Sequence, residues 1–182
     1  MTAPATLASQ TIALVGLMGV GKSSIGRRLA LTLNMPFRDA DIEIEAAAGR
    51  SISDIFAHLG EPAFREGERR VIARLLEGPP HVLATGGGAF VDPSTRALIA
   101  QKAVSVWLKA DLSVLARRVA RRDHRPLVAG KDPVAVLEAH AHDRYPIFET
   151  ADIVIETGEA AHQVAVEAII RALNARVAAC AP

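Results

Sequence analysis

The sequence contains one cysteine, Cys180, so it cannot form a disulfide bond within the chain. It also lacks a charge excess, because 21 basic residues are balanced by 20 acidic ones and the formal net charge is +1. No overall field therefore favours nucleic acid or an anionic membrane as a partner. Aromatic residues make up only 4% of the chain, so the core must be built mainly from Ala, Val, Ile and Leu.

The apolar run at residues 12–20 is too short to cross a bilayer and is closed by Lys22. Residues 1–10 contain no basic residue, so they lack the charged start of a secretory signal. With the single cysteine, these absences predict a cytoplasmic protein. We expect residues 1–9 to be disordered. We also expect a monomer, because no apolar stripe lies outside the predicted elements.

Apolar bursts alternate with helical patterns along the 182 residues, which predicts a single α/β domain, residues 10–182, with a parallel sheet. Strands are expected at 11–15, 37–40, 81–84, 103–108 and 152–155. Helices are expected at 23–33, 42–48, 52–59, 61–77, 93–101, 111–122, 133–144 and 160–178. Gly49 is placed to end one helix, Ser51 to cap the next and Gly60 to break it. Trp107 is expected in the core.

Residues 16–23 read GLMGVGKS and match the pattern GxxxxGK[ST] between a predicted strand and a predicted helix. Glycines let the backbone curl around phosphate oxygens, and the helix N-terminus adds a positive dipole. Lys22 can reach the β- and γ-phosphates, and the Ser23 hydroxyl can hold Mg²⁺. An ordinary glycine-rich turn is the alternative. We expect ATP to be bound here by Gly19, Val20, Gly21, Lys22, Ser23 and Ser24.

Two carboxylates, Asp39 and Asp41, follow the second predicted strand, at the sheet edge where ligands bind in open α/β folds. One could steady the water shell of Mg²⁺, and the other could accept a hydrogen bond from a substrate hydroxyl. Taken alone, two aspartates at a strand end are more often helix caps. Further along the chain, the basic segment 121–131 is interrupted by Pro126 and Gly130 and is expected to form a mobile loop.

Further motifs follow in order: FRDADIEIE at 37–45, GRSISDIF at 49–56, FREGE at 64–68, TGGGA at 85–89, RPL at 125–127 and RYP at 144–146. With the phosphate-binding loop, this series resembles the shikimate kinases over nearly all of residues 12–155. The resemblance implies a three-layer α/β/α fold of the nucleoside monophosphate kinase type, with a five-stranded parallel sheet and the P-loop strand at its centre. It also implies a substrate-binding region at about 39–68 and a mobile lid at about 121–132.

The implied reaction is transfer of the γ-phosphoryl group of ATP to a hydroxyl of shikimate, with Mg²⁺, in chorismate and aromatic amino-acid biosynthesis. By resemblance, Asp41 binds the ring hydroxyls and takes the proton of the attacking one, and Asp39 holds Mg²⁺ through water. Arg65 and Arg144 hold the substrate carboxylate, a task that suits planar guanidinium groups. Backbone without side chains, against which the substrate can lie, is provided by Gly86, Gly87 and Gly88.

Arg125 resembles a lid arginine that closes over the phosphates and neutralises charge in the transition state. Arg118 resembles the arginine that packs against adenine. The neighbouring basic residues, interpreted as a solvated helix face, are Arg117, Arg121 and Arg122. The residues expected to carry the catalysis are Lys22, Asp41 and Arg125.

The sequence departs from the family pattern at two places. Phe148 stands where most members have Tyr, and Glu149 lies one residue early. Near residues 157–159 an arginine that some members use beside adenine is missing, which leaves the adenine pocket the least defined part of the site. Two other functions stay open: a gluconate-type sugar-acid kinase of the same P-loop class, and a nucleotide-binding module without catalysis. His140 and His142 face different sides of a predicted helix and do not form a metal pair.

Overall fold

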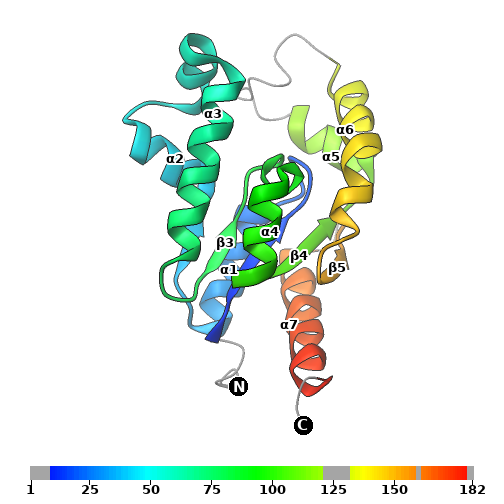
Figure 1. The fold of residues 1–182 in the computed structure, drawn as a ribbon. Helices are drawn as coiled ribbons and strands as arrows, with labels where there is room; N and C mark the ends of the chain where they lie inside the picture. Colours follow the sequence, from blue (N-terminus) through cyan, green and yellow to red (C-terminus); the bar gives the residue numbers. More distant parts are fainter. Residues whose placement is uncertain (1–8, 121–131, 159–160, 180–182) are drawn as a thin grey trace.

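The computed structural model describes residues 9–120, 132–158 and 161–179, which form a five-stranded parallel sheet with helices packed around it (Figure 1). The strands are β1 (Thr11–Val15), β2 (Phe37–Asp39), β3 (Val82–Ala84), β4 (Ala103–Lys109) and β5 (Ile153–Glu156). The helices are α1 (Lys22–Leu33), α2 (Ala40–Ala48), α3 (Ile52–Leu76), α4 (Pro93–Lys102), α5 (Leu112–Ala120), α6 (Pro133–Phe148) and α7 (His162–Ala179), with a short 3₁₀ helix η2 (Ala89–Val91).

The strand order is β2-β3-β1-β4-β5, so the strand that precedes the phosphate-binding loop lies at the centre of the sheet, as expected. Leu14 of β1 pairs with Ala84 of β3 on one side and with Val106 of β4 on the other. All five residues of β1 are buried, which is typical of a parallel strand covered on both faces. Because the strands are parallel, the segments that follow β1, β2 and β3 all emerge at one edge of the sheet.

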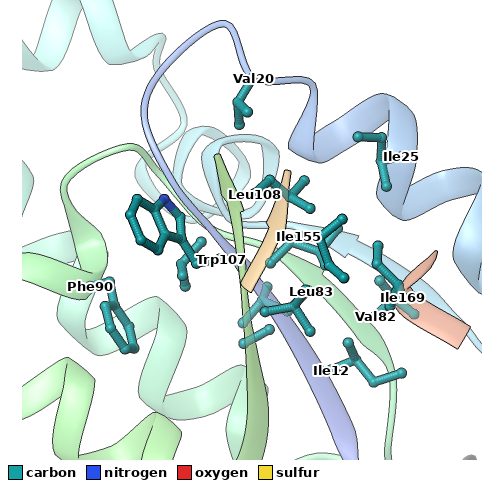
Figure 2. Close-up of a cluster of buried hydrophobic side chains, with 14 of the residues drawn as sticks. Ile12, Val20, Ile25, Val82, Leu83, Phe90, Trp107, Leu108, Ile155 and Ile169 are labelled. Atoms are coloured by element: carbon teal, nitrogen blue, oxygen red, sulfur yellow. The ribbon is translucent and has the colours of Figure 1, made fainter. Parts of the chain in front are cut away.

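The core confirms the expected position of Trp107, which is 1% exposed (Figure 2). Phe148 is buried to the same extent, and its ring centroid lies 6.2 Å from that of Phe90 and 5.8 Å from that of Trp107. A buried tyrosine usually needs a hydrogen-bond partner for its hydroxyl, whereas phenylalanine does not. Phe148 therefore fills this aromatic cluster without a hydroxyl group that would need a partner.

Local signals placed several helix ends correctly. Gly49 ends α2 with a φ of 63°, and the Ser51 side chain accepts a hydrogen bond from the N–H of Asp54 at the start of α3. Gly60 interrupts α3 with φ 81° and ψ 171°, which confirms the expected break. The expected strand at 37–40 is one residue too long, because Asp39 caps α2 and Ala40 already begins that helix.

Helix α6 continues to Phe148, one turn beyond the expected end at Arg144. Pro146 lies inside this last turn, where a proline near a helix end removes only one backbone N–H, and the turn remains helical. The expected lid with Arg125 and the expected disordered N-terminus lie outside the described residues, apart from Ser9 and Asp132. Asp132 caps α6, and its carboxylate accepts a hydrogen bond from the N–H of Val134. Within the described parts of the chain, no helix is both long and apolar enough for a membrane span.

Candidate active site

The phosphate-binding loop connects β1 to α1 and needs its glycines. Gly16 and Gly21 have φ values of 137° and 97°, in the region that L side chains rarely adopt. A Cβ atom on Gly16 would also lie 2.5 Å from the carbonyl oxygen of Leu108. Gly21 is the N-cap of α1 and supplies no side-chain cap, so the first N–H groups of the helix have no side-chain acceptor there and can serve an anion.

The ammonium group of Lys22 is held over this loop. Its Nζ donates to the carbonyl oxygens of Gly16 at 2.7 Å and Leu17 at 3.0 Å, and the residue is only 9% exposed. Lys22 also lines a cavity of about 380 Å³ with Gly19, Gly21, Ser23 and Ser24. The side chain of Val20 is 1% exposed and belongs to the core cluster (Figure 2), so this residue can offer a ligand only its backbone.

Asp39 has both of the roles that the sequence left open, a helix cap and a residue of the site. The Ser23 hydroxyl donates to Oδ2 of Asp39 at 2.6 Å, and Oδ1 of Asp39 accepts the N–H of Asp41 at 3.1 Å. Asp39 is therefore a helix cap and a member of the site at once. Among the described residues no three His, Cys, Asp or Glu side chains form a metal cluster. A hydroxyl beside one carboxylate fits Mg²⁺ instead, since that ion usually keeps waters and binds substrate phosphates.

A second cavity of about 450 Å³ adjoins the first. Asp41 and Gly87 line both of them. The second cavity also receives Arg65 from α3 and Arg144 from α6, two helices that stand on opposite sides in Figure 1. The structure thus brings together Asp41, both arginines and the backbone of Gly86, Gly87 and Gly88.

Arg65 is held by two carboxylates to which the sequence assigned no role. Its Nη1 donates to Oε2 of Glu68 at 2.7 Å, and its Nε and Nη2 donate to Oε1 of Glu61 at 3.2 and 3.1 Å. The side chain of Glu68 is 3% exposed, and its Oε1 has no hydrogen-bond partner among the described residues. Burial raises the pKa of Glu68 and Asp41 adds to the rise, although Arg65 opposes it. The helical spacing of Glu61 and Glu68 from Arg65 was the signal that could have indicated these pairs.

Arg144 donates from Nη1 to the carbonyl oxygen of Gly87 at 3.1 Å. Burial lowers the pKa of Arg144, and the positive charge of Arg65 lowers it further. Arg65 therefore disfavours the charge of Arg144. The pKa of Arg65 itself is raised, because Glu68 and Glu61 outweigh the effect of burial. An anion between the two guanidinium groups would relieve the cost at Arg144. The guanidinium of Arg65 also lies against Gly88, where an added Cβ atom would be 2.8–2.9 Å from it.

Arg118 and His162 also line the first cavity. Arg118 donates from Nη2 to the carbonyl oxygen of Gly158 at 2.7 Å. Nε2 of His162, the first residue of α7, lies 3.3 Å from the position of a Cβ on Gly21. Burial lowers the pKa of His162, and Arg28 and Arg118 lower it further. No local pattern in the sequence pointed to His162, because its place depends on the packing of α7 against α1.

Comparisons with known proteins agree with this geometry. A shikimate kinase family model matches residues 18–174. The shikimate kinase of Caulobacter vibrioides (strain NA1000 / CB15N) is 71% identical over 93% of this chain and 85% of its own length. That of Paramagnetospirillum magneticum is 56% identical over 90% of this chain and 84% of its own length.

Solved structures show the same relationship. The shikimate kinase of Acinetobacter baumannii in complex with shikimate superposes with a TM-score of 0.90 at 34% identity, and covers 94% of this chain and 97% of its own. A gluconokinase of Sinorhizobium meliloti 1021 reaches a TM-score of 0.58 at 22% identity, over 93% of this chain and 94% of its own, which shows a shared fold alone. With the family model matched over most of its length, this chain belongs to the shikimate kinase family.

Proposed function

We infer that this protein is a shikimate kinase, an ATP-dependent phosphotransferase with an alcohol group as acceptor. The observation that carries this inference is the pair of adjoining cavities that share Asp41 and Gly87. One cavity is built on the phosphate-binding loop, and the other is flanked by two arginines. A kinase needs this arrangement, because its acceptor hydroxyl must lie beside the γ-phosphate of ATP.

The chemistry follows from the positions of the charged groups. Asp41, where the two cavities meet, accepts the proton of the attacking hydroxyl, while Lys22 and the N–H groups at the start of α1 stabilise negative charge on the phosphoryl oxygens. Ser23 and Asp39 would hold Mg²⁺, Asp39 through water. When bound, Mg²⁺ neutralises charge on the β- and γ-phosphates. We propose the same assistance from Arg125, which lies outside the described residues.

Substrate selection is assigned to the second cavity. Shikimate carries a carboxylate on one side of its ring and hydroxyls on the other. Arg65 and Arg144 provide cations for the carboxylate, and Asp41 provides an acceptor for the hydroxyls. The backbone of Gly86, Gly87 and Gly88 lets the ring approach without meeting side chains.

The two alternative functions are supported less well. A gluconate-type kinase shares the fold, but the TM-score and identity are both lower than for the shikimate kinases. A nucleotide-binding module without catalysis would not require Asp41, Arg65 and Arg144 to line a second cavity beside the first. Location in the cytoplasm and a monomeric state stay predictions.

The test is a coupled assay of ADP release with shikimate or gluconate as the acceptor. We expect release that depends on shikimate and is absent with gluconate. The Lys22→Ala variant should lose about a thousandfold or more in turnover, because it lacks the charge on the transferring group. ADP release that occurs only with gluconate would overturn the proposed function. So would the absence of ADP release with either acceptor.

A further inference from the structure

His140 lies on α6 four residues before Arg144, so the two side chains occupy the same face of the helix in successive turns. The residue is half-buried, and its Nδ1 is buried without a hydrogen-bond partner among the described residues. No hydrogen-bond partner therefore sets the protonation of this imidazole. Its protonation depends instead on the charged groups around it.

Those charges come from two helices. On α6 they are Arg144 and Asp143, and on α3 they are Arg65 and Glu61. Burial lowers the pKa of His140 and Arg144 lowers it further; Arg65 adds to the lowering, while Asp143 and Glu61 oppose it. Both arginines that repel a proton on His140 are the ones assigned to the substrate carboxylate.

Two further elements pack against α6. Helix α5 carries Arg117 and Arg118, and Arg118 is bonded to the carbonyl oxygen of Gly158. The 3₁₀ helix η2 carries no charged side chain. Neither element supplies a carboxylate, so the balance at His140 is set mainly by α3 and by α6 itself.

We propose that His140 couples binding of the acidic substrate to uptake of a proton, and thereby sets how tightly Arg65 and Arg144 hold a carboxylate as the pH changes. This rests on the proposed function. His140 is assigned as a residue that acts through the arginine pair, not as one that touches the reacting atoms.

The direction follows from the charges. In the free enzyme the two arginines disfavour the imidazolium form of His140. A bound carboxylate neutralises them, so the pKa of His140 rises when the substrate binds. Affinity for the substrate therefore increases as the pH falls through the pKa of the complex, and levels off below the pKa of the free enzyme. One added positive charge on His140, partly screened by solvent, corresponds to about a three- to tenfold change in the affinity for shikimate.

The helix offers a matched control. His142 is exposed and two residues away, and its side chain points to a different side of α6. We would compare His140→Asn with His142→Asn, since both remove an imidazole from the same helix. For each protein, the KM for shikimate is measured between pH 5.5 and 8. Calorimetry of shikimate binding in buffers of different ionisation enthalpy then counts the protons taken up.

We expect wild type and H142N to bind shikimate about three- to tenfold more tightly at the acid end and to take up a fraction of a proton. In H140N the KM for shikimate should vary less with pH, and shikimate binding should take up no proton. The KM for ATP should not show the same dependence on pH in any of the three proteins. An unchanged profile in H140N overturns the proposal. If H140N does not fold, wild-type calorimetry decides, because absence of proton uptake rejects it. Failure of shikimate-dependent ADP release would instead reject the proposed function.

Discussion

The hydroxyl of Ser23 donates a 2.6 Å hydrogen bond to Oδ2 of Asp39, which joins the first turn of α1 to the start of α2. The second oxygen of Asp39 accepts the N–H of Asp41. One carboxylate therefore positions both the hydroxyl assigned to Mg²⁺ and the backbone of the proposed base. Asp39 therefore links a residue of the nucleotide cavity, Ser23, to Asp41, which lines both cavities.

Asp39→Asn should separate the two tasks of this carboxylate. Asparagine can still cap α2, so we expect the free energy of unfolding to change by no more than about 1 kcal/mol. The neutral amide holds the water shell of Mg²⁺ less well, and we expect half-maximal activity to need about tenfold more Mg²⁺. Activity is measured against Mg²⁺ concentration. Asp92→Asn makes the same change at the cap of α4, outside both cavities, and an equal shift in that control would contradict the assignment.

Arg144→Ala and Arg65→Ala should act on shikimate more than on ATP. Loss of a charged partner in a closed site costs about 2–5 kcal/mol, or roughly thirty- to several-thousand-fold in binding. R65A should also destabilise the fold more than R144A, because it leaves the carboxylate of Glu68 buried without its cation. Steady-state kinetics with each substrate varied, together with thermal unfolding, measure both effects. Arg69→Ala is the control, because Arg69 lies on the same helix as Arg65 and pairs instead with Asp92, the cap of α4. Loss of ATP affinity with shikimate affinity intact would refute the roles.

Gly88→Ala should weaken shikimate binding although both arginines remain in the chain. The new methyl group would lie 2.8–2.9 Å from the guanidinium of Arg65, so that group must move away from its present position. We expect the KM for shikimate to rise about tenfold or more, as a misplaced binding group typically causes. Gly67→Ala is the matched control, because no atom lies within 4 Å of its added Cβ and alanine favours the helix. Equal KM values for the two variants would show that the position of Arg65 does not matter.

Glu68 should make stability depend on pH in an unusual direction for a carboxylate. Its pKa is raised in the folded protein, chiefly by burial, so the folded state binds the proton more tightly than the unfolded state. The contribution of Glu68 to stability is therefore largest below its unfolded pKa and decreases as the pH rises through the folded pKa. Urea unfolding at pH values from about 4 to 7 should show wild type losing stability relative to Glu68→Gln over this window. A difference between the two proteins that does not vary with pH would contradict the raised pKa.

Much of this protein is determined by local sequence. The phosphate-binding loop, the glycine at position 49 and the Ser51 cap depend on backbone conformation and on neighbours a few residues away, and the structure confirms each of them. The run of apolar residues at 11–15 likewise indicated a strand, and the structure buries all five residues of β1. The resemblance to a known family then supplied the strand order and the site residues that no local pattern could give.

Tertiary structure alone decided the rest. Arg65 and Arg144 face one cavity because α3 and α6 stand on either side of it, and the lowered pKa of Arg144 follows from burial and from that approach of Arg65. His162 reaches Gly21 only because α7 packs against α1. The spacing of Glu68 from Arg65 was visible in the sequence, but the burial that raises its pKa was not. Sequence patterns report interactions between near neighbours, whereas desolvation and charge coupling depend on groups that only the folded chain brings together.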